Sequence, residues 1–232
     1  MAISFISSAV AYITSNTAIS ITHGLTLADG DVLIALISNN NASGGQSMTS
    51  DSSYFTQHYL GKQGTVQAGA IVIFSRYITT ASGEPSAYAW TQSSAVSATV
   101  HLFQFRGVHT DIWDVLPAVA NITAGTTVGA GAITAPDITI IASGAMGLLM
   151  AAVVASAALL SSPTNGYGDL IVYAQGAGRC QGMARKAALP AGATGTSALT
   201  LNVADDYAIC QCALKPAPAA WAGITVIRDV RA

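Results

Sequence analysis

The chain has 232 residues, a length that suits one large all-β domain or two small domains. Only 9% of its residues are charged, against roughly 25% in ordinary globular proteins, and its net charge is −2. Lysine and arginine do not cluster, and none occurs between Arg106 and Arg179, which argues against nucleic acid as a partner. So few charges imply a surface that is either polar and uncharged or buried against other subunits, and the second case predicts a homo-oligomer.

Short runs rich in Val, Ile, Thr and Tyr, bounded by Gly, Ser, Asn or Pro, predict β-strands along the whole chain. Two long runs, residues 69–80 and 95–106, are apolar on both faces, which is typical of strands inside a sandwich. One face would pack on a second sheet, and the other could be a subunit contact. In chain order, the clearest strands are predicted at residues 18–22, 31–38, 54–60, 69–80, 86–90, 95–106, 137–141, 146–155, 170–174, 182–188, 198–203 and 208–214.

The order of these features occurs twice. Residues 25–38 and 138–154 both read as an apolar run, a polar turn and a second apolar run. Residues 75–107 also lie against residues 184–216 without a gap, which matches Arg76 with Arg185. We therefore predict an all-β fold, an antiparallel jelly-roll-like β-sandwich over residues 1–218 built from two similar halves, about 1–115 and 130–216. Two tandem sandwiches are the alternative. Residues 39–53 form a polar loop, and residues 121–131 connect the halves.

Residues 141–160 carry no charge and are long enough to cross a membrane. They are rich in Ala, Gly and Ser and lack flanking basic residues, so two buried strands are the favoured interpretation, with no membrane contact. The first basic side chain is Lys62, so no secretory signal is expected. Three cysteines without a Cys-x-x-Cys motif indicate buried thiols in a chain folded in a reducing cytoplasm.

The C-terminal residues 219–232 follow a Pro-Ala-Pro hinge and have no counterpart in the first half. They alternate like a strand, so they form either a final strand of the parent sheet or an arm that adds a strand to a neighbouring subunit. The residues expected to make that contact are Trp221, Ile224, Val226, Arg228 and Arg231.

Residues able to carry catalysis are sparse. Glycoside hydrolysis needs two carboxylates about 5–10 Å apart, but Glu84 is the only glutamate and stands in a predicted turn. The pairs Asp111 with Asp114 and Asp205 with Asp206 are also typical of turns. Neighbouring Arg179 and Arg185 could lower the pKa of Cys180, yet no histidine stands out as its base, and no Gly-x-Ser-x-Gly motif occurs. We predict no enzyme, no catalytic residue and no cofactor.

Binding sites are equally weakly marked. His101, His109 and Asp111 are the best metal candidates, but no further ligand has a recognisable spacing, so no metal site is predicted. Carbohydrate binding stays an alternative, with Trp90, Trp113, Tyr54 and Tyr59 as candidate aromatics and residues 39–53 and 111–114 as candidate loops.

Four segments, ADGDVLIA at residues 28–35, SRY at 75–77, GEPSAYAW at 83–90 and FQFRGV at 103–108, follow one another in an order that resembles β-sandwich proteins of bacteriophage virions. The resemblance implies a non-enzymatic virion component made in the host cytoplasm, with no catalytic residues to carry over. It implies first a capsid decoration (cement) protein that binds the major capsid protein or another virion protein. The alternative is a carbohydrate- or receptor-binding module of a tail or fibre.

Overall fold

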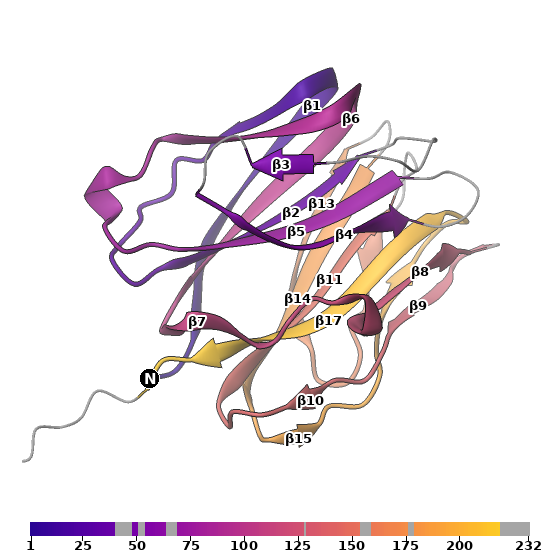
Figure 1. Ribbon diagram of the computed structural model, residues 1–232. Helices are drawn as coiled ribbons and strands as arrows, with labels where there is room; N and C mark the ends of the chain where they lie inside the picture. The colour runs from indigo at the N-terminus through magenta and orange to yellow at the C-terminus, as the bar shows by residue number, and fades with distance from the viewer. Residues whose placement is uncertain are drawn as a thin grey trace, which may run out of the picture.

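The computed structural model describes residues 1–39, 48–50, 54–63, 69–127, 129–153, 159–175 and 179–218. Strands dominate these residues, as predicted (Figure 1). Two short 3-10 helices, η1 (Ala81–Gly83) and η2 (Val119–Asn121), interrupt them. The strands are β1 (Ser4–Thr22), β2 (Val32–Asn39), β3 (Met48–Ser50), β4 (Thr56–Gln63), β5 (Gly69–Tyr77), β6 (Ala87–Arg106), β7 (Val108–Val115), β8 (Ile122–Thr126), β9 (Gly131–Ala135), β10 (Thr139–Ile140), β11 (Ala145–Val153), β12 (Leu160–Ser161), β13 (Gly168–Gln175), β14 (Arg179–Leu189), β15 (Gly192–Ala193), β16 (Ser197–Leu201) and β17 (Asp206–Pro216).

The strands form two large antiparallel sheets, the first from β1–β6 and the second mainly from the second half, with β7 of the predicted first half as its outer strand. The first sheet has the order β1-β6-β2-β5-β4, with β3 also paired to β6. The second has the order β7-β17-β11-β14-β13, with β8 also paired to β17. The two orders correspond strand by strand, so the prediction of an all-β fold with two similar halves is confirmed. The strand order does not confirm the finer prediction of a jelly roll.

Matching turns support the correspondence of the halves. Gly30 and Gly144 both have a positive φ, of 86° and 88°, which glycine adopts without strain. Each donates its N–H to a carbonyl at the end of β5 or β14, Gly30 to Ile78 and Gly144 to Leu189, both at 2.8 Å. The second apolar run of each half, β2 or β11, begins directly after this turn.

The ungapped match between the halves holds in the last strands but slips by one residue earlier. Ile34 of β2 pairs with Phe103 of β6, and its counterpart Leu148 of β11 pairs with Cys212 of β17, as the ungapped match requires. On their other sides, Ile34 pairs with Ser75 but Leu148 pairs with Arg185. Arg185 therefore corresponds to Ser75 and not to Arg76, because the chain from this position to the last strand is one residue shorter in the second half.

The two large sheets pack face to face around a central core (Figure 1). Side chains alternate between the two faces of a strand, so every second residue of β2, β11, β17 and the last part of β6 points into this core. Its buried members include Leu36, Phe103, Leu148 and Cys212. The result is one sandwich whose two large sheets come mainly from different halves.

Two side chains, Trp113 and Gln181, donate hydrogen bonds across this core. The indole N–H of Trp113 (β7) donates to Nε2 of His58 (β4) at 3.1 Å. The amide of Gln181 (β14) donates to the hydroxyl of Ser38 (β2) at 2.7 Å. Burial lowers the pKa of His58, which favours the neutral ring that can accept the indole N–H.

The outer face of each large sheet is covered by the same chain, which corrects the expectation of a subunit contact there. In the first half, bulges bend β1 and β6, so that Ile19, Ile21, Tyr88 and Trp90 fold over the outer face of β2 and β5. In the second half, the small sheet β12-β16-β9 does the same. Both apolar faces of these strands are therefore buried by residues of the same chain.

Several predicted boundaries were wrong. The strand predicted at residues 18–22 is only the end of β1, and those predicted at 86–90 and 95–106 are one strand, β6. The predicted connector 121–131 contains β8, and β7 was not predicted. The charge-free stretch from residue 141 contains the buried strand β11, as favoured. Within the described ranges, no helix has the length and apolar character needed to span a bilayer.

Candidate functional site

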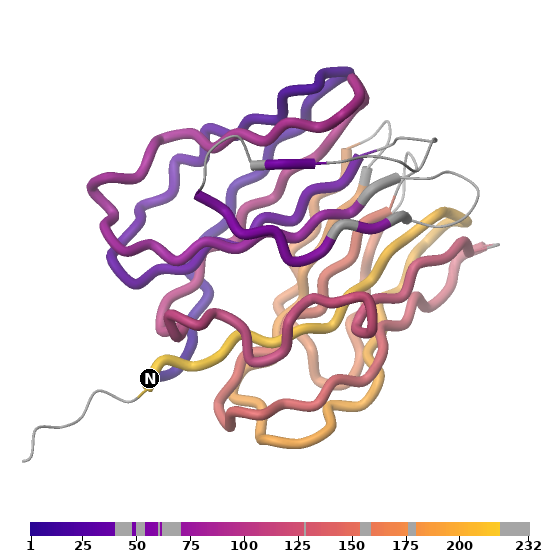
Figure 2. The backbone as a smooth tube through the Cα atoms, in the orientation of Figure 1, coloured from indigo at the N-terminus to yellow at the C-terminus, as the bar shows by residue number. Residues whose placement is uncertain are grey.

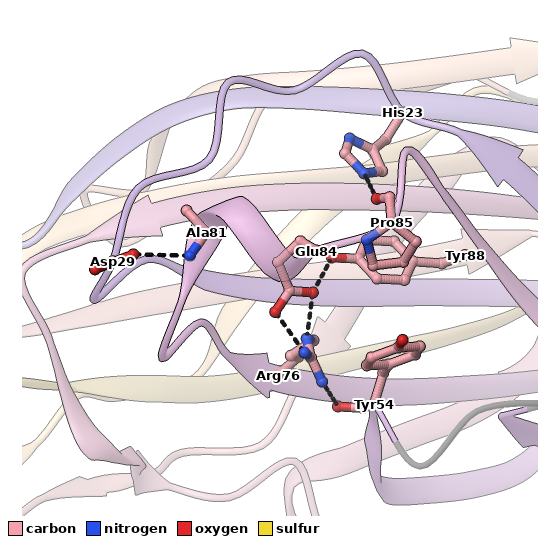
Figure 3. Close-up of polar contacts among 8 residues, drawn as sticks. All are labelled: His23, Asp29, Tyr54, Arg76, Ala81, Glu84, Pro85 and Tyr88. Carbon is pink, nitrogen blue, oxygen red and sulfur yellow. Dashed lines mark hydrogen bonds and ion pairs between the residues drawn. The ribbon is translucent and has the colours of Figure 1, made fainter.

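A polar cluster lies where β5 leads through η1 into β6 (Figure 3). The Arg76 guanidinium forms a two-point ion pair with the carboxylate of Glu84, with Nε 2.9 Å from Oε2. The Tyr88 hydroxyl donates to the same Oε2 at 2.8 Å. Arg76 also donates to the backbone carbonyl of Tyr54 at 2.9 Å, and its guanidinium carbon lies 4.4 Å above the centre of the Tyr54 ring. All three guanidinium nitrogens of Arg76 and both carboxylate oxygens of Glu84 therefore take part in hydrogen bonds.

His23 closes the cluster on its other side. Its ring stacks on that of Tyr88, with the ring centres 5.1 Å apart (Figure 3). Nδ1 of His23 accepts the N–H of Leu25 at 3.0 Å, so the proton of the neutral ring sits on Nε2 and is donated to the carbonyl of Pro85 at 2.9 Å. The ring therefore ties the end of β1 to the turn before β6.

A hollow of about 270 Å³ borders this cluster, lined by residues 22–25, 27, 81 and 84–86. Its one carboxylate, Glu84, already accepts hydrogen bonds from Arg76 and Tyr88. Burial and the adjacent Glu84 carboxylate raise the pKa of the Tyr88 phenol well above its usual value. The Tyr88 phenol is therefore not ready to exchange a proton near neutral pH, and both donors hold the Glu84 carboxylate in place, so the cluster is built as a brace between loops.

We expect Glu84→Gln to lower the free energy of unfolding by about 1–3 kcal/mol. The Glu84 side chain is only 4% exposed, and a glutamine would turn an amide N–H toward one of the two donors that now meet the carboxylate. Urea unfolding followed by circular dichroism measures the change. Asp111→Asn is the matched control, because it removes the same charge from an exposed ion pair with Lys215. Equal losses in the two variants would contradict the bracing role.

The carboxylates of the other candidate acids accept hydrogen bonds from nearby backbone and hydroxyl groups. Asp114 accepts the backbone N–H groups of Ile141 and Ala142, each at 2.8 Å. Asp205 accepts the N–H of Asp206 at 2.7 Å, and the Asp206 carboxylate accepts the hydroxyl of Thr126. The side chains of Asp114 and Asp205 thus serve turns, but the prediction that the acids stand in turns was wrong for Asp111 and Asp114, which lie on β7, and for Asp206, which lies on β17.

The structure brings together two of the three metal candidates. Nδ1 of His109 accepts the N–H of Asp111 at 2.9 Å, whereas His101 is buried on the inner face of β6. Among the residues that the structure describes, no three His, Cys, Asp or Glu side chains are grouped so that they could hold a metal ion.

The three cysteines are buried and free, as the sequence suggested. Burial raises the pKa of Cys180 to about 11 and also raises that of Cys212. The arginines near Cys180 therefore do not lower its pKa, and the Cys180 thiol is a poor nucleophile.

The aromatic candidates for sugar binding are mainly structural. Trp90 and Trp113 are buried, and Tyr59 packs against the central core. Tyr54 is 38% exposed, but its ring carries Arg76. Most of the candidate loop 39–53 lies outside the described residues.

A groove of about 490 Å³ lies where the first and last described residues meet, lined by residues 1–3, 143–144, 187–188 and 216–218. The chain continues from here into residues 219–232, which lie outside the described residues. All five predicted contact residues, Trp221, Ile224, Val226, Arg228 and Arg231, are in that segment.

Sequence reasoning missed the open edge of β1. β1 is the outermost strand of the first sheet and, among the described strands, pairs only with β6. The available signal was the absence of Asp, Glu, Lys and Arg from residues 1–28.

Comparisons with protein-family models, with curated proteins and with solved structures each find no match to this chain.

Proposed function

We propose that this chain is a non-enzymatic structural protein that assembles with copies of itself and binds a larger particle. Its sequence resemblance makes a phage capsid decoration protein the first candidate. The open edge of β1 is the observation that carries the proposal. This edge is 19 residues long and uncharged, and Ile6 and Val10 on it are 40% and 37% exposed.

An open edge of this kind is a template for another strand, and monomeric proteins usually protect it with charges, prolines or bulges. The opposite edge strand, β4, has a bulge at residues 57–59 and contains Lys62. The outer strand β13 of the second sheet contains the exposed Asp169. β1 has bulges near its start and its middle, but its register against β6 is regular from Ser7 to Ile13.

The chemistry of the polar groups supports the same proposal. The Glu84 carboxylate is engaged by Arg76 and Tyr88, and the thiols are buried. The tryptophans weighed as a sugar platform, Trp90 and Trp113, are in the interior. These observations favour contacts between proteins over catalysis or sugar binding.

Light scattering of the purified chain at several concentrations tests the proposal. We expect a mass of at least twice 23.5 kDa that is reached as concentration rises. A monomer over the whole range would contradict self-assembly. Peptides of this chain should also be found by mass spectrometry in phage particles released from the host that carries its gene. A specific signal on a glycan array, together with a monomeric mass, would favour the carbohydrate-binding alternative.

A further inference from the structure

The chain end leaves the molecule beside the start of the open edge. The N–H of Ala217 donates to the carbonyl of Gly107 at 2.8 Å. The N-terminal ammonium of Met1 donates to the carbonyl of Ala217 at 3.1 Å. In Figure 2, the yellow end of the described chain therefore lies next to the indigo N-terminus. The last described residue, Pro218, therefore directly follows a residue that contacts Met1, three residues before β1 begins.

The segment that follows has the length and pattern of a strand. Residues 219–232 number 14 and can span about 46 Å when extended. The part of β1 before its middle bulge, Ser4 to Ile13, pairs with β6 and spans about 33 Å at 3.3 Å per residue. Ile224 and Val226 fall on one face of such a strand and Thr225 and Ile227 on the other.

The path of the chain disfavours pairing of this segment with its own β1. β17 ends beside the start of β1, so the chain would have to turn sharply to follow that edge (Figure 1). Lys215 and Ala217 each precede a proline, and this position favours extended backbone. Pro216 and Pro218 also have a fixed φ. This preference for extended backbone at residues 215–218 favours pairing with another copy over a return to the same edge.

We infer that the C-terminal segment of one copy pairs with the open edge of β1 of a second copy, which adds a strand to its first sheet. This inference rests on the proposed function, because it names the partner in self-assembly. Main-chain hydrogen bonds along β1 would supply the affinity, and exposed Ile6 and Val10 would gain apolar cover. Reciprocal exchange between two copies closes the assembly as a symmetric dimer.

Two single changes test the two sides of the contact. Deletion of residues 219–232 and the substitution Val10→Lys should each reduce the mass in light scattering from that of a dimer to 23.5 kDa. The lysine adds a charge to the edge at an exposed position, so it blocks pairing without entering the core. Val119→Lys is the matched control, since Val119 is 78% exposed in η2, away from β1, and its variant should keep the mass of the dimer.

Mixing the two monomeric variants gives the decisive result. The truncated chain keeps an open edge but has no arm, whereas the Val10→Lys chain keeps its arm but has a blocked edge. We expect the mixture to form a dimer that contains one chain of each kind. Unchanged thermal unfolding of both variants excludes misfolding as the cause of dissociation.

Other outcomes separate the inference from the proposed function. A truncated chain that still dimerises would overturn the inference, because β1 would then pair with β1, but would leave self-assembly standing. Two monomeric variants that fail to combine would overturn it as well. If the full chain is monomeric at every concentration, the arm folds on its own molecule, for instance with Trp221 in the groove beside Pro218, and both proposals fail.

Discussion

Asp31→Ala should lower the free energy of unfolding by about 2–6 kcal/mol, because it removes the acceptor of the partly buried Ala28 N–H and of one N–H of the buried Gln104 amide, at about 1–3 kcal/mol each. The Asp31 carboxylate is fully buried. It accepts the N–H of Ala28 at 2.8 Å and the side-chain amide of Gln104 at 2.7 Å. Arg106 adds two contacts, at 2.7 and 3.0 Å, but its side chain is 47% exposed and can turn to water. Most of the loss therefore comes from Ala28 and Gln104.

The second half of the chain supplies the control. Ala145 stands at the position of Asp31, and Ala213 stands at the position of Gln104. That half keeps the same turn without either polar side chain. With alanine at both positions, no buried side-chain donor is left without an acceptor. The double variant Asp31→Ala with Gln104→Ala should therefore lose clearly less stability than the sum of the two single variants. Strict additivity in urea unfolding would contradict this account.

The Asp31 network also predicts a loss of stability in acid. Burial by itself would raise the pKa of Asp31, but hydrogen bonds from Arg106, Ala28 and Gln104 together lower it below 3.8. A carboxyl group with a lowered pKa in the folded state stabilises the fold above its unfolded pKa. That stabilisation is lost as pH falls below about 4.

The strands that could be predicted from the sequence are those with a clear hydrophobic pattern. β2 and β11 are continuous apolar runs after a glycine turn, so their identity and the duplication they mark were recognisable. β1 was mostly missed because its first half mixes Ser and Ala with apolar residues and gives no clean alternation. It is a strand because β6 pairs with it over nearly its whole length, which is a tertiary effect that local sequence does not encode.

The candidate sites could also be predicted only in part, because residue type is visible in the sequence but distant partners are not. That Glu84, Asp114 and Asp205 serve turns could be expected from residue type alone. The partners of Glu84 could not, because Arg76 is eight residues away and the Tyr54 carbonyl lies on another segment. Likewise, the open edge exists only once the strand order is known, since it depends on which strand is outermost.

His101 should make the protein lose stability between pH 6.5 and about 4. The ring is 2% exposed on the inner face of β6, its centre lies 4.1 Å from that of Phe103, and its Nδ1 has no hydrogen-bond partner among the described residues. Burial lowers the pKa of His101 to about 4. In this pH window the unfolded chain binds a proton that the folded chain does not, so stability falls with pH by about 1.4 kcal/mol per unit.

His101→Leu removes this proton uptake and should recover about 2 kcal/mol of the loss between pH 7.5 and pH 5. Urea unfolding at a series of pH values measures it. Some slope should remain, because burial also lowers the pKa of His58 in the same core. Phe103→Leu, two residues along on the same face, should instead lower stability by a similar amount at every pH, since it removes volume and no titrating group. An unchanged pH slope in His101→Leu would mean that the ring is protonated in the folded protein, where a charge would lie between the two large sheets and the core would have to admit water to hold it.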